Sequence, residues 1–281
     1  MRRAITLLTV VLAVVALDTL ASAEWEGTPP PSLGNDWTVV SDTTLTGEEV
    51  YLAGDLTVKA GTSLTLDGTT LVLTGGGQHA ILVETGAGLV VRDSVVSAAM
   101  GTHYTWSSYG DTLVASSDIS GLFGGIQARS DGLRVEGTRI HDCVGPAIEL
   151  HGNDATITGC VIDNVDVGIS SVSIDIPEVE DGVMITDGWT VTIADSVITA
   201  RSYGVYQHWK KSLSGTLDLD FITTLDNVEI TGSTNAGVYL YVDLYVNKGT
   251  GTLDELFDFK FTGGEASRNG GPGIYVYHYI K

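Results

Sequence analysis

A six-residue unit recurs nine times along this chain of 281 residues and limits what the chain can fold into. Each unit has apolar residues at its first and sixth positions and Gly, Asp, Asn or Ser at its third. The clearest copy runs from Leu66 to Leu71, with Gly68 third, and the other copies begin at Leu45, Val91, Val114, Val135, Ile157, Ile193, Leu225 and Phe261. A third apolar position follows each unit: Leu56, Ile81, Tyr104, Ile126, Ile148, Ile169, Val205, Val238 and Ile274.

The first six copies begin 21 to 25 residues apart, which is too short for a domain but suits one turn of a solenoid with three short strands. The third residue of each unit tolerates a left-handed or tight-turn backbone, so each unit is interpreted as a bend between two strands. The pattern therefore predicts an all-β parallel β-helix of about nine coils. The sixth residues should form one inward column: Leu71, Val96, Ile119, Ile140, Ile162, Ile198 and Ile230.

The last three coils carry 11 to 15 additional residues, which enter at the same corner each time. Alternating apolar residues flank glycine-containing turns in these inserts, a pattern typical of β-hairpins. We predict three hairpins, near residues 170–192, 206–224 and 239–260, that leave one corner and pair side by side. Their exposed tips, near Asp181, Ser214 and Lys248, should be the first sites of limited proteolysis.

The sequence of the N-terminal region indicates that the protein is exported from the cell. Residues 1–23 combine a basic start, an apolar stretch and an Ala-Ser-Ala cleavage site, as a secretory signal peptide does. Residues 24–36 are interpreted as a linker and residues 37–281 as the β-helix domain, with residues 37–44 as its N-terminal cap. We expect a secreted or cell-surface protein, with a further C-terminal domain or a partner chain on the open end of the last coil.

The chain has 35 acidic and 14 basic side chains, a net charge of −21, which argues against nucleic acid as a partner. The register places Cys143 and Cys160 on different corners, so no disulfide is expected between them. Asp163 and Asp166 could supply oxygen ligands to calcium, but no calcium-binding loop motif surrounds them. We interpret them as solvated loop acids and predict no cofactor.

Side chains alternate along a strand, so the residues beside each third apolar position point outward. They form two predicted columns: Leu82, Thr105, Gln127, Glu149, Ser170, Tyr206, Tyr239 and Tyr275; and Glu84, Ser107, Arg129, His151, Val172, His208, Tyr241 and Tyr277. The aromatic members Tyr206, His208, Tyr239, Tyr241, Tyr275 and Tyr277 are the candidate ligand-binding residues, suited to stacking on sugar rings. In the alternative interpretation the hairpins fold over these tyrosines and bury them.

Residues 38–281 resemble the right-handed parallel β-helix repeat proteins of the pectin-lyase-like superfamily. The bend units carry the resemblance, together with strand starts in which Gly precedes an apolar residue, at Gly125, Gly168, Gly204, Gly237 and Gly273. The resemblance implies that the parallel β-helix is right-handed. Many relatives are secreted polysaccharide lyases or hydrolases, and others are adhesins, phage spikes or envelope proteins.

The resemblance also implies where catalysis would occur, because the enzymes of the superfamily work through carboxylate clusters on the outward strand face. That face offers Glu149, His151 and Arg129 here, and these are the candidate catalytic residues. Glu84 should lie about 14 Å from Glu149 at the coil spacing, too far for the carboxylate pair of an inverting hydrolase. The favoured function is therefore structural or binding, with a polysaccharide or cell-surface glycan as partner. A polysaccharide lyase or glycoside hydrolase and a purely structural stalk or adhesin segment are the alternatives.

Overall fold

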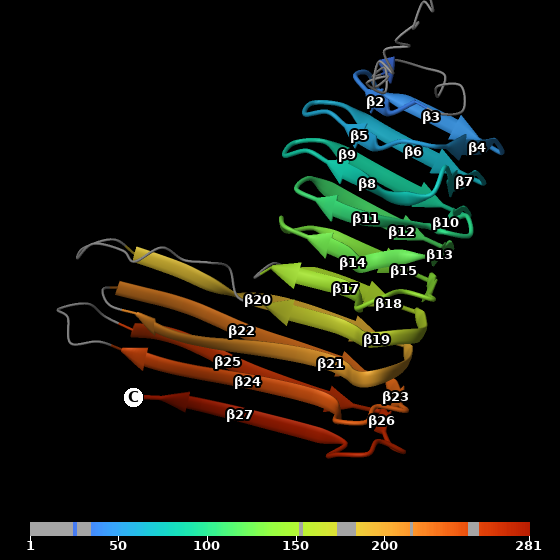
Figure 1. Ribbon diagram of the computed structural model, residues 1–281. Coiled ribbons are helices and arrows are strands. Elements are labelled where there is room, and N and C mark those ends of the chain that lie inside the picture. The colour runs from blue at the N-terminus through green and yellow to red at the C-terminus, as the bar shows by residue number, and fades with distance from the viewer. Residues whose placement is uncertain (1–24, 27–34, 152–153, 173–183, 214–215, 247–252) are drawn as a thin grey trace, which may run out of the picture.

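The computed structural model describes residues 25–26, 35–151, 154–172, 184–213, 216–246 and 253–281. Every regular element among them is a β-strand, and the strands stack into one elongated solenoid (Figure 1). All strand pairings in these ranges are parallel and join equivalent segments of successive coils. The described residues form no helix that is long and apolar enough to cross a membrane.

One wall of the solenoid is a nine-stranded sheet that contributes one strand to each coil. Its strands are β3 (Thr43–Thr46), β6 (Ser63–Asp67), β9 (Gly88–Arg92), β12 (Asp111–Ala115), β15 (Leu133–Glu136), β18 (Ala155–Thr158), β20 (Met184–Ala194), β22 (Thr216–Asp226) and β25 (Leu253–Thr262). These strands carry the first apolar residue of each bend unit. Leu45 pairs with Leu66, Leu66 with Val91, and the register continues to Phe261.

The second sheet has 18 strands and supplies the other two walls. The short wall after the bend consists of β4 (Glu49–Leu52), β7 (Thr70–Leu73), β10 (Val95–Ala98), β13 (Asp118–Ser120), β16 (Arg139–His141), β23 (Glu229–Thr231) and β26 (Glu265–Ala266). The third wall consists of β1 (Trp25–Glu26), β2 (Trp37–Val39), β5 (Leu56–Val58), β8 (Gly77–Val83), β11 (Thr102–Ser108), β14 (Leu122–Ala128), β17 (Pro146–His151), β24 (Ala236–Val246) and β27 (Ile274–Ile280). Two long strands, β19 (Val161–Val172) and β21 (Val197–Leu213), run through both walls.

The third residue of every bend unit adopts a left-handed backbone, as predicted. The nine φ angles lie between 47° and 67°, at Gly47, Gly68, Asp93, Ser116, Gly137, Gly159, Asp195, Asn227 and Gly263. In the second to seventh units the fourth residue is buried in the solenoid, where small side chains form a ladder. Thr69 N donates to Ser94 Oγ (2.9 Å), and Ser94 N donates to Ser117 Oγ (3.1 Å). Cys160 occupies the same position and donates from its backbone N to Ser196 Oγ (3.1 Å).

The seven sixth residues from Leu71 to Ile230 form the predicted inward column, and each is at most 1% exposed. Successive strands align them in register, from Leu71 beside Val96 to Ile198 beside Ile230. The apolar side chains of successive coils therefore stack into a continuous core. This packing confirms the parallel β-helix that the repeat predicts.

The register of the third wall differs from the prediction at one coil. Trp106, not Tyr104, aligns with Ile81 below and Ile126 above. Both aromatic side chains are fully buried, and a register shift beside Tyr104 is absorbed in β14, where Gly124 and Gly125 have positive φ angles. Ser107 therefore joins Gln127 in the first outward column, the place predicted for Thr105.

The inserts leave one corner and pair side by side, as predicted, and their strands extend beyond the N-terminal coils (Figure 1). Within the described residues, the two arms of one insert do not pair with each other as the arms of a hairpin would. β21 pairs with β24, and β22 pairs with β25, so the outgoing and returning arms belong to different sheets. The inserts thus form a two-layered sandwich, here named the lateral extension. The predicted hairpin tips near Asp181, Ser214 and Lys248 lie outside the described residues.

Aromatic packing between the two layers explains this arrangement. The Phe221 ring lies 4.9 Å from the ring of Trp189 and 5.1 Å from that of Trp209, and all three side chains are buried. A buried polar chain lies beside them. Trp189 Nε1 donates to Thr223 Oγ1 (3.0 Å), which donates to Gln207 Oε1 (2.7 Å). Gln207 Nε2 donates to Ser171 Oγ (3.1 Å), so the chain connects both sheets.

The N-terminal end also departs from the prediction. β2 is an additional rung of the third wall, with Trp37 beside Leu56, rather than a segment lying over the first coil. β1 pairs with β2 in the same way, so Trp25 and Glu26 belong to the solenoid rather than to a linker. The predicted signal peptide, residues 1–23, lies outside the described residues.

Candidate functional site: an aromatic grid on the lateral extension

The predicted aromatic residues come together on the outer face of β21, β24 and β27. One column contains Tyr206, Tyr239 and Tyr275, and the next contains His208, Tyr241 and Tyr277. A third column contains Lys210, Asp243 and Tyr279, and Tyr203 adjoins the first column. These ten residues are here named the aromatic grid.

The rings within a column stack on one another along the solenoid axis. Tyr239 lies 5.3 Å from Tyr206 and 5.0 Å from Tyr275, at interplanar angles of 14° and 11°. Tyr241 lies 5.0 Å from His208 and 4.7 Å from Tyr277, at 21° and 12°. Neighbouring rings therefore cover both faces of Tyr239 and Tyr241. Because the faces are covered, a sugar cannot stack on these two rings in the way the sequence suggested. A ligand can reach only the edges of the rings and their hydroxyl oxygens.

The tyrosines are not buried beneath the inserts, because each is partly exposed and Tyr275 is 38% exposed. Partial burial raises the pKa of Tyr206 and Tyr239. Burial, with a hydrogen bond to Asp243, raises the pKa of Tyr241 to about 12. Burial and the neighbouring Lys210 lower the pKa of His208. At neutral pH Tyr206, Tyr239 and Tyr241 are thus protonated phenols, and His208 is a neutral imidazole.

Asp243 lies at the distal side of the grid and is only 2% exposed. Its Oδ2 accepts a hydrogen bond from the Tyr241 hydroxyl (3.0 Å) and lies 3.2 Å from Lys210 Nζ. Its Oδ1 is buried without a hydrogen-bond partner among the described residues. Sequence reasoning missed Asp243, Lys210 and Tyr279, although continuing the same alternation by two residues along each arm identifies all three.

The candidate catalytic residues lie on earlier coils of the same wall. His151 Nε2 lies 3.0 Å from Glu149 Oε1 without hydrogen-bond alignment. Arg129 lies over the Tyr109 ring, 5.8 Å from its centroid. Glu84 forms an ion pair with Lys59 (2.9 Å), and this contact lowers the pKa of Glu84. Each of these residues therefore has a partner on its own or a neighbouring coil.

Asp163 and Asp166, which the sequence placed in a loop, lie instead within β19 and form ion pairs with arginines. Asp163 accepts two hydrogen bonds from Arg139 (2.9 and 3.1 Å), and Asp166 pairs with Arg201 (3.0 Å). No group of three or more His, Cys, Asp or Glu side chains among the described residues could hold a metal ion.

A histidine of the short wall bridges two coils. His141 Nε2 lies 2.9 Å from Asp118, and its Nδ1 lies 2.6 Å from Asp142. Burial opposes the imidazolium, but these hydrogen bonds outweigh it and raise the pKa of His141.

The two cysteines are free, buried thiols. Burial raises the pKa of Cys143 to about 12 and also raises the pKa of Cys160. Neither thiol therefore has the low pKa and the exposure of a reactive cysteine.

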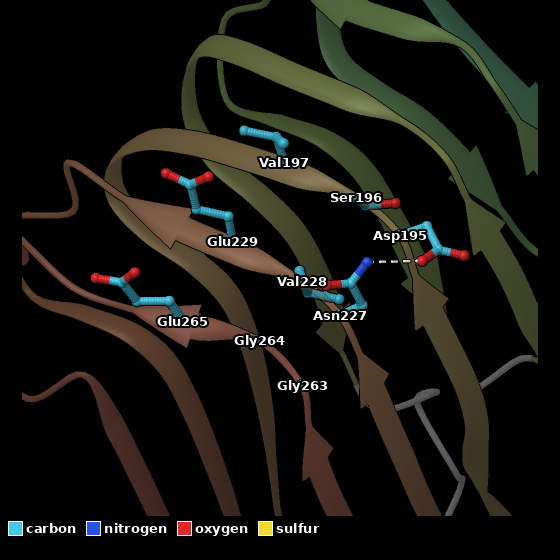
Figure 2. A pocket seen from close by; sticks show the side chains of 9 residues that line it. All are labelled: Asp195, Ser196, Val197, Asn227, Val228, Glu229, Gly263, Gly264 and Glu265. Atoms are coloured by element: carbon cyan, nitrogen blue, oxygen red, sulfur yellow. Dashed lines mark hydrogen bonds between the residues drawn. The ribbon is translucent and has the colours of Figure 1, made fainter.

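A hollow of about 400 Å³ lies at the bend corner of the last three coils (Figure 2). Bend residues line it, and Asn227 Nδ2 donates to Asp195 Oδ1 (2.8 Å) across two coils. Glu229 and Glu265 occupy the same side in register (Figure 2). The hollow is a gap between bends with repeated acidic side chains, and its lining shares no residue with the aromatic grid.

Comparison with known proteins agrees with the topology. A family model described as the right handed beta helix region matches residues 46–179. The chain is therefore a right-handed parallel β-helix protein, and the described strands continue the same architecture to β27. No match was found among curated proteins.

Proposed function

We propose that the protein is a secreted or cell-surface solenoid that binds a neutral polysaccharide or cell-surface glycan through the aromatic grid. One observation carries the proposal: a partly exposed surface of tyrosine and histidine rings that repeat every 4.7 to 5.3 Å, with an ion pair, Lys210 and Asp243, at the distal side. Tyrosine provides hydrogen-bonding groups on a rigid side chain at low cost in conformational entropy. The net charge of −21 disfavours acidic polymers as ligands.

Hydrogen bonding, rather than ring stacking, is the recognition mode that the covered ring faces favour. The phenol groups of Tyr239 and Tyr241 stay protonated at neutral pH. Tyr239 can donate to a sugar oxygen and accept from a sugar hydroxyl, whereas Tyr241 donates its proton to Asp243 and can accept from a sugar hydroxyl. A polysaccharide that follows the columns would meet one such group per coil. The exposed ring of Tyr275, in the last coil, offers additional apolar contact.

Substitutions at Tyr239 test this mode. Binding of the mature chain to a glycan array is measured with and without calcium, and the best ligand is then titrated. Tyr239→Phe keeps the stacked ring but removes the hydroxyl, so we expect a several-fold loss of affinity with unchanged thermal stability. Tyr51→Phe, on a distant coil, is the matched control and should bind normally. Full affinity of Tyr239→Phe would contradict recognition through the hydroxyl groups.

The same assay separates binding from catalysis. A binding protein releases neither reducing nor unsaturated ends from the polymer that it binds. Release of such ends, with its loss in Glu149→Gln, would instead establish the lyase or hydrolase alternative. Absence of any glycan ligand, together with unfolding of Tyr239→Ala, would favour the structural stalk.

A further inference from the structure

Two tyrosines of the grid combine a stacked phenol partner with a carboxylate that can accept a proton. The rings of Tyr241 and Tyr277 lie 4.7 Å apart, the shortest separation between two tyrosines in the grid, and are nearly parallel at 12°. Both side chains are partly exposed. The Tyr241 hydroxyl donates to Asp243 Oδ2 (3.0 Å).

We propose that Tyr241 and Tyr277 form an oxidative cross-linking site, at which a peroxidase using hydrogen peroxide joins their rings as dityrosine. Loss of one electron makes a phenol strongly acidic, and Asp243 lies in position to take the proton from Tyr241. Because proton and electron leave together, no isolated radical cation has to form in this partly desolvated site. The proposal is independent of glycan binding.

The reaction is balanced. Each ring loses one electron and its hydroxyl proton and becomes a phenoxyl radical. The two radicals couple through a new carbon–carbon bond ortho to the hydroxyl groups, and the two ortho hydrogens then move to the oxygens. The protein loses two hydrogen atoms in total, which reduce one hydrogen peroxide to two waters. The product links β24 to β27, covalently joining the last two coils.

Other tyrosines of the chain provide internal comparisons. The Tyr51 hydroxyl donates to Glu49 (2.5 Å), but its neighbour in register is Val72, so it lacks a ring to couple with. Tyr239 and Tyr275 are stacked at 5.0 Å, but the described residues give Tyr239 no carboxylate acceptor. The pair Tyr241 and Tyr277 is thus expected to react before either of the others.

The test treats the dilute mature chain with a heme peroxidase and limiting hydrogen peroxide. We expect dityrosine fluorescence at unchanged molecular size. A linked pair of tryptic peptides should appear, lighter than their sum by two hydrogens. Tyr239 and Tyr241 lie between the same two lysines, Lys211 and Lys248, so variants must assign the link.

Tyr241→Phe should abolish the cross-link, whereas Tyr239→Phe and Tyr51→Phe should leave it intact. Asp243→Asn should slow its formation several-fold if its circular dichroism matches the unchanged chain. Cross-links only between chains, equal yield at Tyr239 and Tyr275, or no link in a correctly folded chain would each overturn the proposal. Formation at the normal rate in folded Asp243→Asn would overturn the role of the carboxylate.

Discussion

The left-handed backbone conformation at each bend has an energetic cost that depends on the side chain of the residue that adopts it. Glycine adopts this backbone freely, Asn and Asp tolerate it, and β-branched residues strongly disfavour it. Ser116, with a φ of 49°, is exposed and belongs to neither category. It is therefore a clean position at which to measure how much bend chemistry contributes to stability.

Ser116→Gly should be at least as stable as the unchanged chain, whereas Ser116→Val should lose about 1–2 kcal/mol. The physical reason is the contact between Cβ and the backbone in the left-handed region, which worsens with branching. Urea denaturation followed by circular dichroism measures both variants. Equal stability of Ser116→Val and the unchanged chain would show that the bend can move to another conformation.

The residue scale is also where sequence reasoning was most successful. All nine bend positions and the inward column from Leu71 to Ile230 were predictable, because few residue types satisfy a left-handed turn beside an inward apolar side chain. The third wall was harder. Tyr104 and Trp106 are both aromatic and both point inward, so alternation alone cannot decide which one aligns with Ile126. The bulge beside Gly124 and Gly125 decides it.

At the scale of elements, the arms of the inserts show what a strand pattern leaves open. Alternation and glycine turns correctly predicted extended arms that leave one corner. They do not say which strand each arm will pair with. Arms of similar length on successive coils continue the registers already set by the solenoid, and the buried Trp189, Trp209 and Phe221 hold the two layers face to face. Ring stacking in the aromatic grid follows from that parallel register, so it could be recognised only from the structure.

Gln207 should be the most sensitive polar position of this junction. Gln207→Leu leaves the Thr223 hydroxyl without its acceptor and Ser171 without its donor, at a cost of about 1–3 kcal/mol for each buried group left unsatisfied. Ser171→Ala is the matched control, because it removes only the outer bond and should cost less. Thermal unfolding monitored by tryptophan fluorescence compares them. A Gln207→Leu variant no less stable than Ser171→Ala would mean that the polar chain does not hold the layers together.

At the scale of the whole molecule, parallel stacking repeats charge as faithfully as it repeats apolar residues. Glu229 lies beside Glu265, and Asp218 beside Asp254, within a chain of net charge −21. Like charges in register repel, and net charge far from zero opposes a compact state. The composition gives the net charge, but it does not show which acidic residues lie side by side, because these pairs depend on the strand register.

Added salt should therefore stabilise the protein. Raising the ionic strength from about 0.01 M to about 0.15 M shortens the Debye length from about 30 Å to about 8 Å and screens the repulsion. We expect the melting temperature to rise over this range, as measured by differential scanning calorimetry. The double variant Glu229→Gln with Glu265→Gln should melt higher at low salt and respond less to added salt. A melting temperature that is constant or falls with salt would contradict this account.

The strands are longer in the C-terminal coils than in the N-terminal coils, so the contacts between coils should resist mechanical force more strongly toward the C-terminal end. Four residue pairs join β3 to β6, whereas eleven join β20 to β22 and ten join β21 to β24. Tension along the solenoid axis loads the interfaces between coils in series, so the interface with the fewest bonds yields first. A chain pulled from both ends would therefore peel from its N-terminal coils, while the lateral extension stays folded as the anchor.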